Sequence, residues 1–210
     1  MADMATIATL ATAGGTLVLA VATFASVRSA NRAARTAERA LQAGLRPVLV
    51  PSRLQDPPEK IGWMDNHWAK VDGGRGYALV ENDNVYLAIA LRNVGRGMAV
   101  LHGWTPVYGP VDGSTPPSEL DRFHRLSRDL YVPPADTGFW QGAVRDLDDP
   151  DFGPLADLIK NRESIRLDIL YGDHEGGQRT ITRFGLIPYQ DGSWLASAAR
   201  HWNIDRPDPR

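Results

Sequence analysis

An uncharged run near the N-terminus constrains the fold of this chain more than any other feature. Between Met4 and Val27 no residue is ionisable, and Asp3 is the one charge that precedes the run. As an α-helix the run would be about 36 Å long, which is enough to cross a hydrocarbon core of about 30 Å. The sequence therefore predicts a transmembrane helix within residues 1–27.

The run is only moderately apolar, so other interpretations stay open. Five threonines, one serine and two glycines interrupt it. Hydroxyl groups can bond back to the preceding helical turn, which lowers their cost in lipid. A cleaved signal peptide would carry its positive charge before the run, and a buried helix of a soluble core would be shorter or show a polar face. A membrane anchor is the interpretation that we favour.

The charges that flank the run predict its orientation. Five arginines and one glutamate follow it within residues 28–46, whereas no lysine or arginine precedes it. Because positive charge stays on the cytoplasmic side, we expect the N-terminus outside and the C-terminal domain in the cytoplasm. The absence of cysteine fits a reducing compartment, but it fits any other compartment as well.

The helix is predicted to continue as a basic juxtamembrane segment, residues 28–46. Ala, Arg, Leu and Glu dominate this segment and are strong helix formers. Gly44 is a plausible C-cap, and Pro47 disfavours helix just before it. One continuous helix from about Met4 to Ala43 is therefore expected.

Two faces of this helix are candidate contact surfaces. Small residues at helical spacing in the membrane run, Ala8, Ala11 and Gly15, favour close approach of a second helix and hence a homo-oligomer. Four arginines recur at i, i+4, i+7 and i+11, so they share one face that we expect to contact anionic membrane lipid. These are Arg28, Arg32, Arg35 and Arg39.

After Pro47 the apolar pattern changes to period two, which predicts strands. In 85–92 aliphatic residues occupy every second position, from Val85 to Leu91, as in a half-buried strand, and Asn82-Asp83-Asn84 before it is a turn signal. About eight short strands, a helix over 151–161 and Gly/Pro turns predict a mainly β domain, an antiparallel immunoglobulin-like β-sandwich, over residues 47–204. Residues 205–210 are predicted to be a disordered tail.

The six tryptophans all follow the predicted anchor, and most are expected in the core. Residues 55–75, rich in Pro, Gly and Asp, are predicted to be a long loop. Trp63 and Trp68 lie in it and are therefore the tryptophans expected to be exposed. If exposed, they mark a partner surface, because aromatic residues are enriched in protein interfaces. A stacking platform for a sugar or peptide is the alternative.

No residue pattern indicates an enzyme. Asp173-His174-Glu175 offers three potential metal ligands, but adjacent residues at the tip of a hairpin point apart, so a metal-dependent hydrolase is the weakest alternative. The glycine clusters at 73–76 and 95–97 run into predicted strands, not into a helix N-terminus that could hold phosphate. Net charge is −2 and the basic residues concentrate beside the membrane, so we expect neither nucleic acid nor a cofactor as ligand.

Four segments carry a resemblance to uncharacterised actinobacterial single-pass membrane proteins with a C-terminal β-sandwich domain. The segments are Leu91–Trp104, Ser127–Gly142, Ile169–Thr180 and Arg200–Pro207. The resemblance implies a helix-anchored β-sandwich and no known activity, and it transfers no catalytic residue. The sequence is thus interpreted as a membrane-anchored, non-enzymatic module whose cytoplasmic domain binds an unknown protein partner.

Overall fold

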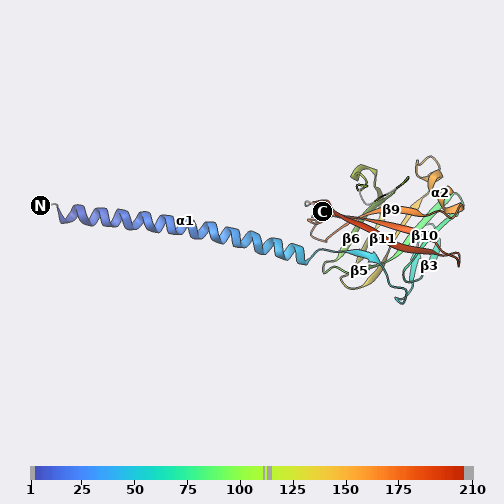
Figure 1. Cartoon of the computed structure of the whole chain (residues 1–210), viewed down its shortest axis with the longest axis horizontal. Helices are drawn as coiled ribbons and strands as arrows, with labels where there is room; N and C mark the ends of the chain where they lie inside the picture. Colours follow the sequence, from blue (N-terminus) through green and yellow to red (C-terminus); the bar gives the residue numbers. More distant parts are fainter. Residues whose placement is uncertain (1–2, 111, 113–114, 206–210) are drawn as a thin grey trace. The chain divides into compact units, whose positions relative to one another are not determined.

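The computed structural model describes residues 3–110, 112 and 115–205. The chain forms two compact units, Met1–Ala43 and Gly44–Arg210. The first unit is helical and the second is rich in β-strands (Figure 1).

The first unit is the helix α1, Met4–Gly44, which confirms the predicted continuous helix. Three of its threonines bond back to the preceding turn: Thr12 Oγ1 donates to Ala8 O (2.9 Å), Thr16 Oγ1 to Thr12 O (2.8 Å) and Thr36 Oγ1 to Arg32 O (3.0 Å). Within the described residues α1 is the one helix that length and composition make able to cross a membrane, with a mean hydropathy of 1.8 in its apolar window.

The second unit contains eleven strands, a short 3₁₀ helix η1 and one α-helix in its described part. The strands are β1 (Leu49–Pro51), β2 (Glu59–Gly62), β3 (Trp68–Val71), β4 (Arg75–Glu81), β5 (Asn84–Asn93), β6 (Ala99–Pro106), β7 (His124–Val132), β8 (Thr137–Val144), β9 (Ile165–Gly172), β10 (Thr180–Pro188) and β11 (Trp194–Asn203). The helices are η1 (Leu120–Arg122) and α2 (Phe152–Lys160).

Nine strands form one antiparallel sheet. Eight of them follow the order β1-β5-β4-β11-β10-β9-β6-β7, and the ninth, β8, also pairs with β5. The sheet bends around one core, because buried side chains from strands far apart in this order share a cluster. Leu49 N, on β1, donates to the Tyr171 hydroxyl on β9 at 3.2 Å. The mainly β domain after a long helix is therefore confirmed, while its immunoglobulin-like character stays a prediction.

The pairing between β4 and β11 contains fewer residue pairs than any other strand pairing in this sheet. It pairs Gly76 with Trp194 and Arg75 with Leu195, and Ala196 N donates to Gly74 O at 3.0 Å just beyond the ladder. Gly76 has no room for a side chain, since a Cβ there would lie 2.2 Å from Leu186 Cδ2. Few backbone pairs thus connect the two halves of the sheet.

Strand β5 is the centre of the domain. Asn82 and Asp83, both with positive φ, make the predicted tight turn between β4 and β5. The alternation in β5 predicted a half-buried strand, but both faces are buried. One face joins the main core through Leu87 and Ile89, and the other carries Tyr86 and Ala88 in a second cluster.

The second cluster exists because residues 55–75 are not the predicted long loop. They form a hairpin of β2 and β3, paired from Glu59↔Val71 to Gly62↔Trp68. Ile61 and Ala69 pack from this hairpin onto the second face of β5. A period-two pattern at Ile61 and Trp63 was the local signal for this strand, and Pro and Gly around it obscured the pattern.

The structure also shows how the segment before β7 and the residue Asp205 near the C-terminus are positioned. Residues 120–122 form η1, and the chain then enters β7 at His124. Asp205, assigned to the disordered tail, instead accepts hydrogen bonds from Arg179 at 2.7 to 3.3 Å. Residues 206–210, the rest of that tail, lie outside the described residues.

Candidate functional site

The arginine face of α1 has the geometry that the sequence predicted. All four arginines lie on one uninterrupted helix and their side chains are exposed: Arg28, Arg32, Arg35 and Arg39. Glu38 is the single acidic residue of this helical segment. An exposed row of guanidinium groups can donate hydrogen bonds to phosphate oxygens, which is the chemistry of anionic headgroups.

Trp68 is exposed as expected, with 59% of its surface accessible. It lies opposite Gly62 in the hairpin, where its indole covers the glycine so closely that a Cβ there would lie 2.7 Å from the ring. Lys60 Nζ lies 5.2 Å from the ring centroid, within range of a cation–π contact. The indole of Trp68 is therefore both exposed and held in place by its neighbours in the hairpin.

Trp63 contradicts the expectation of exposure, because only 5% of it is accessible. Its Nε1 donates to Gly142 O on β8 at 3.1 Å, and its ring packs against those of His67 and Tyr86. The sequence misplaced Trp63 because the hairpin that buries it was interpreted as a loop. Trp63 therefore belongs to the second core, and of the two tryptophans Trp68 alone is a surface candidate.

A buried phenol lies beside this core. Tyr86 donates to Asp65 Oδ2 at 2.6 Å. Burial, and then the hydrogen bond and charge of Asp65, raise the pKa of Tyr86 to about 12. Burial alone would raise the pKa of Asp65, but the hydrogen bonds from Tyr86 and Arg145 outweigh it and lower that pKa. The phenol stays protonated at neutral pH and serves as a structural donor.

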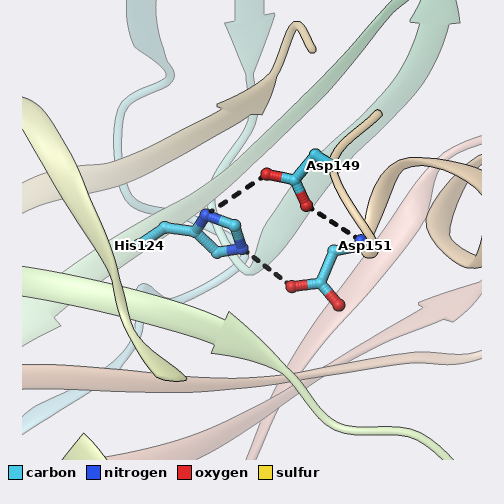
Figure 2. A group of neighbouring side chains, drawn as sticks. All are labelled: His124, Asp149 and Asp151. Carbon is cyan, nitrogen blue, oxygen red and sulfur yellow. Dashed lines mark hydrogen bonds and ion pairs between the residues drawn. The ribbon is translucent and has the colours of Figure 1, made fainter. Parts of the chain in front are cut away.

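One group of potential metal ligands comes together in the described part of the chain: His124, Asp149 and Asp151 (Figure 2). His124 begins β7, and the two aspartates precede α2. His124 Nε2 lies 2.8 Å from Asp151 Oδ2, and Nδ1 lies 3.8 Å from Asp149 Oδ2. The imidazole also stacks on Trp104, with ring centroids 4.9 Å apart.

These three side chains are better placed to bond one another than to hold an ion. The two ring nitrogens of His124 face different carboxylates, and a single ion can take only one nitrogen of an imidazole. Asp149 Oδ1 accepts the backbone N–H of Asp151 at 2.8 Å, and Asp151 Oδ1 accepts the Tyr108 hydroxyl at 3.0 Å. The cluster thus connects β7 to the start of α2.

The sequence interpretation missed this cluster because its members are far apart in the chain. The acidic run at 146–151 directly before a helix was an available signal, since carboxylates favour helix N-termini. Asp151 occupies the N-cap of α2 but makes no side-chain cap bond. Its carboxylate contacts His124 and Tyr108 instead.

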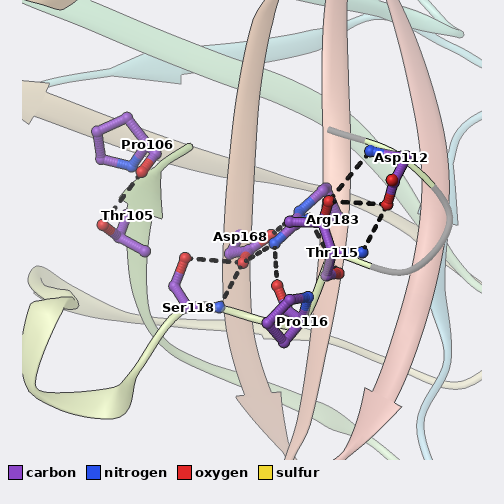
Figure 3. Close-up of polar contacts among 8 residues, drawn as sticks. All are labelled: Thr105, Pro106, Asp112, Thr115, Pro116, Ser118, Asp168 and Arg183. Atoms are coloured by element: carbon purple, nitrogen blue, oxygen red, sulfur yellow. Dashed lines mark hydrogen bonds and ion pairs between the residues drawn. The ribbon is translucent and has the colours of Figure 1, made fainter. Parts of the chain in front are cut away.

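A second polar cluster lies on β9 and β10 (Figure 3). Arg183 donates through Nε and Nη2 to the two oxygens of Asp168 at 2.7 and 2.8 Å, and both side chains are almost fully buried. Arg183 Nη2 also donates to Pro116 O at 2.8 Å, while Ser118 donates through N and Oγ to Asp168. The pair therefore fastens the loop before η1 onto the sheet.

The predicted hairpin around Asp173-His174-Glu175 connects β9 to β10. Asp173 is buried and accepts from Gly177 N (2.9 Å) and Gln178 Nε2 (3.1 Å), so it stabilises the loop. His174 and Glu175 are exposed and pair with each other at 3.2 Å. Asp173 thus bonds within the loop, whereas His174 and Glu175 contact each other and do not point apart as expected.

Comparison of the chain with protein-family models, with curated proteins and with solved structures finds no match. The resemblance to actinobacterial membrane proteins therefore stays a prediction.

Proposed function

We propose that the chain is a single-pass membrane protein whose β domain is a non-enzymatic interaction module. The observation that carries the proposal is α1, an exposed helix of 41 residues with an uncharged first part and an arginine face behind it. In cell fractionation, the protein should stay with membranes after washing at high pH and dissolve only in detergent. Recovery in the soluble fraction without detergent would exclude the anchor.

In this proposal the N-terminus lies outside and the β domain in the cytoplasm, because the arginines follow the uncharged run. Protease added to intact spheroplasts should leave residues 47–210 undigested until the membrane is opened. Digestion from outside would reverse the orientation and favour ligand binding by an extracytoplasmic domain.

The arginine face is proposed to contact anionic lipid, with about 1 kcal/mol per arginine near the surface. Replacing Arg28, Arg32, Arg35 and Arg39 together by glutamine should abolish preferential copurification of phosphatidylglycerol over phosphatidylcholine. Replacing the same four by lysine is the matched control, because it keeps the charge and should keep the preference. Equal lipid preference in all three proteins would contradict lipid contact.

Trp68 is the proposed centre of the surface for the protein partner, because it is exposed and fixed over Gly62. A photoreactive phenylalanine analogue at Trp68 should cross-link a protein in native membranes. The same analogue at Tyr131, which is 52% exposed on β7, is the control and should not. Equal cross-linking at both positions would remove Trp68 from the proposal.

Self-association through the membrane helix is the remaining part of the proposal. Gly14 and Gly15 have open space around them, so a second helix can approach closely. Gly15→Leu should lower the dimer fraction of the full-length chain in detergent, and Leu17→Val, a change on the opposite face of the helix, should not.

A further inference from the structure

Strand β4 keeps part of one side unpaired. One side of β4 pairs with β5 along 76–81, whereas β11 pairs with the other side only at Arg75 and Gly76. Beyond Gly76, no strand in the described part of the chain pairs with that second side. This unpaired side of β4, over residues 77–81, is its open edge.

The turn between β4 and β5 determines which backbone groups point to the open edge. Both turn residues have positive φ, so Glu81 and Asn84 close a two-residue hairpin as a hydrogen-bonded pair. In an antiparallel ladder only every second residue bonds to a given neighbour. The N–H and C=O groups of Ala78 and Val80 therefore point away from β5, toward the open edge.

The outward backbone groups of Ala78 are buried without a partner. Gly74, on the same side of the strand, is paired with β11, because Ala196 N donates to its carbonyl at 3.0 Å. Ala78 is only 9% accessible, yet no hydrogen bond among the described residues reaches its outward N–H or C=O. Buried backbone groups are nearly always paired in proteins. The open edge thus offers a donor and an acceptor to another extended chain.

A groove of about 480 Å³ lies along the open edge. Residues 76–79 of β4 line it, together with the end of β3 and the end of α2. Val71 of β3 packs in the second cluster beside Tyr77, whereas Ile159 of α2 packs in the main core with Ala78. Successive residues of a strand point to opposite faces, so β3 and α2 flank β4 on opposite faces. The open edge is therefore recessed between them.

The recess selects the kind of strand that can pair there. In a second copy of this domain the edge of β4 is recessed in the same way. Two such edges cannot approach to the distance of about 4.8 Å that separates paired strands. A single extended segment, with no layers packed on either face, can enter. The partner strand is therefore a peptide segment, and symmetric pairing of two β4 edges is excluded.

The groove contains one cation more than its carboxylates neutralise. Of the three cations that line it, two pair with aspartates at 3.5 to 4.0 Å. The third, Arg162, lies 4.4 Å from the centroid of the Trp194 ring and donates to Ser193 O at 2.8 Å. It contacts no carboxylate among the described residues. A carboxylate on an incoming segment would supply the missing charge.

We propose that this groove, the strand groove, binds an extended acidic segment of a protein partner by β-strand addition. The segment pairs through its backbone with the N–H and C=O of Ala78, and one of its Asp or Glu side chains accepts from Arg162. The inference rests on the proposed interaction module and specifies how its domain holds the partner. Trp68 begins β3, the strand whose last residues line the strand groove.

Selection of short random displayed peptides on the full-length chain in neutral detergent tests the strand groove. The selected peptides should be rich in β-branched residues, which suit a strand, and should carry Asp or Glu. The tightest peptide, synthesised with acetyl and amide ends, should bind at one site in calorimetric titration. Exchange of its acidic residue for the amide should weaken binding about tenfold, because a charge-assisted hydrogen bond is lost.

An N-methyl scan of the same peptide tests backbone pairing on the wild-type chain. Methylation should weaken binding at every second position only, because alternate N–H groups of a strand face the same neighbour. Equal effects at all positions, or no effect at any, would overturn strand addition. This scan needs no variant of the protein.

One variant locates the pairing on β4. Ala78→Pro removes the outward N–H and keeps every bond to β5, since proline is tolerated where the N–H of an edge strand faces outward. We expect the peptide to bind about tenfold more weakly or not at all. Ala78→Val is the matched control, because it adds similar bulk and keeps the N–H, and it should change the affinity less than threefold. Circular dichroism establishes that both variants are folded.

The strand groove is overturned if the folded Ala78→Pro variant binds the peptide as tightly as Ala78→Val, or if no selected peptide binds the wild type to saturation. Photo-cross-linking at Trp68 reports on the interaction module separately. A protein cross-linked at Trp68, without any peptide bound at β4, would overturn the strand groove and leave the proposed function intact.

Discussion

Arg179 and Arg183 lie four residues apart along the chain, and each pairs with an aspartate, Arg179 with Asp205 at the surface and Arg183 with Asp168 in the interior. Arg183 and Asp168 are 3% and 0% exposed in their side chains, whereas Arg179 and Asp205 are 42% and 25% exposed. Both arginines use Nε and Nη2 on the carboxylate, with shortest distances of 2.7 Å. The comparison teaches that the same hydrogen-bond geometry can have very different energetic weight, because water replaces a lost partner only at the surface.

Breaking the buried pair should have the largest effect. Asp168→Ala leaves the Arg183 charge without its carboxylate in the protein interior, and it deprives Ser118 of its acceptor. We expect the free energy of unfolding to fall by about 3–5 kcal/mol. Urea unfolding of the full-length chain in detergent, monitored by tryptophan fluorescence, measures the change. A loss under 1 kcal/mol would mean that water reaches Arg183.

Removing both charges of the buried pair should restore most of that loss. In Asp168→Leu/Arg183→Met no buried charge remains, and apolar groups fill a similar volume. Because desolvation of an ion pair costs about as much as its attraction returns, the double variant should unfold within about 2 kcal/mol of the wild type. A double variant as unstable as Asp168→Ala would indicate that fastening the 115–118 loop, rather than charge balance, carries the stability.

The His124 cluster is intermediate in burial and should be intermediate in energy. His124→Phe keeps an aromatic ring on Trp104 but removes both nitrogen contacts to Asp149 and Asp151. A loss of about 1–2 kcal/mol is expected in the same urea titration. Added Zn²⁺ or Mn²⁺ should not stabilise the wild type, and a stabilisation that His124→Phe abolishes would show that the cluster binds metal.

The exposed pair should have the smallest effect, and a pH-dependent one. The hydrogen bond from Arg179 lowers the pKa of Asp205 below 3.8 in the folded state. Its contribution is therefore present above pH 3.8 and is lost as the pH falls through the folded pKa. Asp205→Asn should cost less than about 1 kcal/mol at pH 7, and less still in high salt.

Unfolding midpoints of the wild type and Asp205→Asn should converge as the pH is lowered from 7 toward 2. Asp168→Ala, by contrast, should remain destabilised in high salt, because a buried charge is poorly screened. If the two pairs respond alike to salt, burial is not the property that separates them.

The sequence predicted those features of the fold that depend on residues close to one another in the chain. Helix α1 follows from helix-forming residues between Asp3 and Pro47, and the turn at Asn82 and Asp83 follows from residues that tolerate positive φ. The strand over 85–92 was also predicted, because its alternating pattern depends only on residues that are close in the chain. Its second buried face was not predicted, because Ala88 and Ala90 are as compatible with solvent as with a packed hairpin.

What could not be predicted depends on residues that meet only in the folded domain. His124 and Asp151 are 27 residues apart, and Asp168 meets Ser118 across 50 residues. No spacing rule connects such positions without the sheet order. The cross-strand row of Arg166, Gly185 and Ser197 has the same origin, since these residues become neighbours only when β9, β10 and β11 pair in register.

The two-residue pairing between β4 and β11 affects the order in which the domain can fold during synthesis. Residues 76 and 194 belong to the pairing with the greatest sequence separation in the sheet. On a ribosome, β4 emerges more than a hundred residues before its neighbour β11 does. Loop closure slows such distant pairings, so the domain should acquire its two half-sheets first and close along this joint last. Until then the unpaired backbone groups at the edge of β4 can pair with a strand of another chain. Because only two residue pairs connect β4 to β11, few of these groups wait for β11.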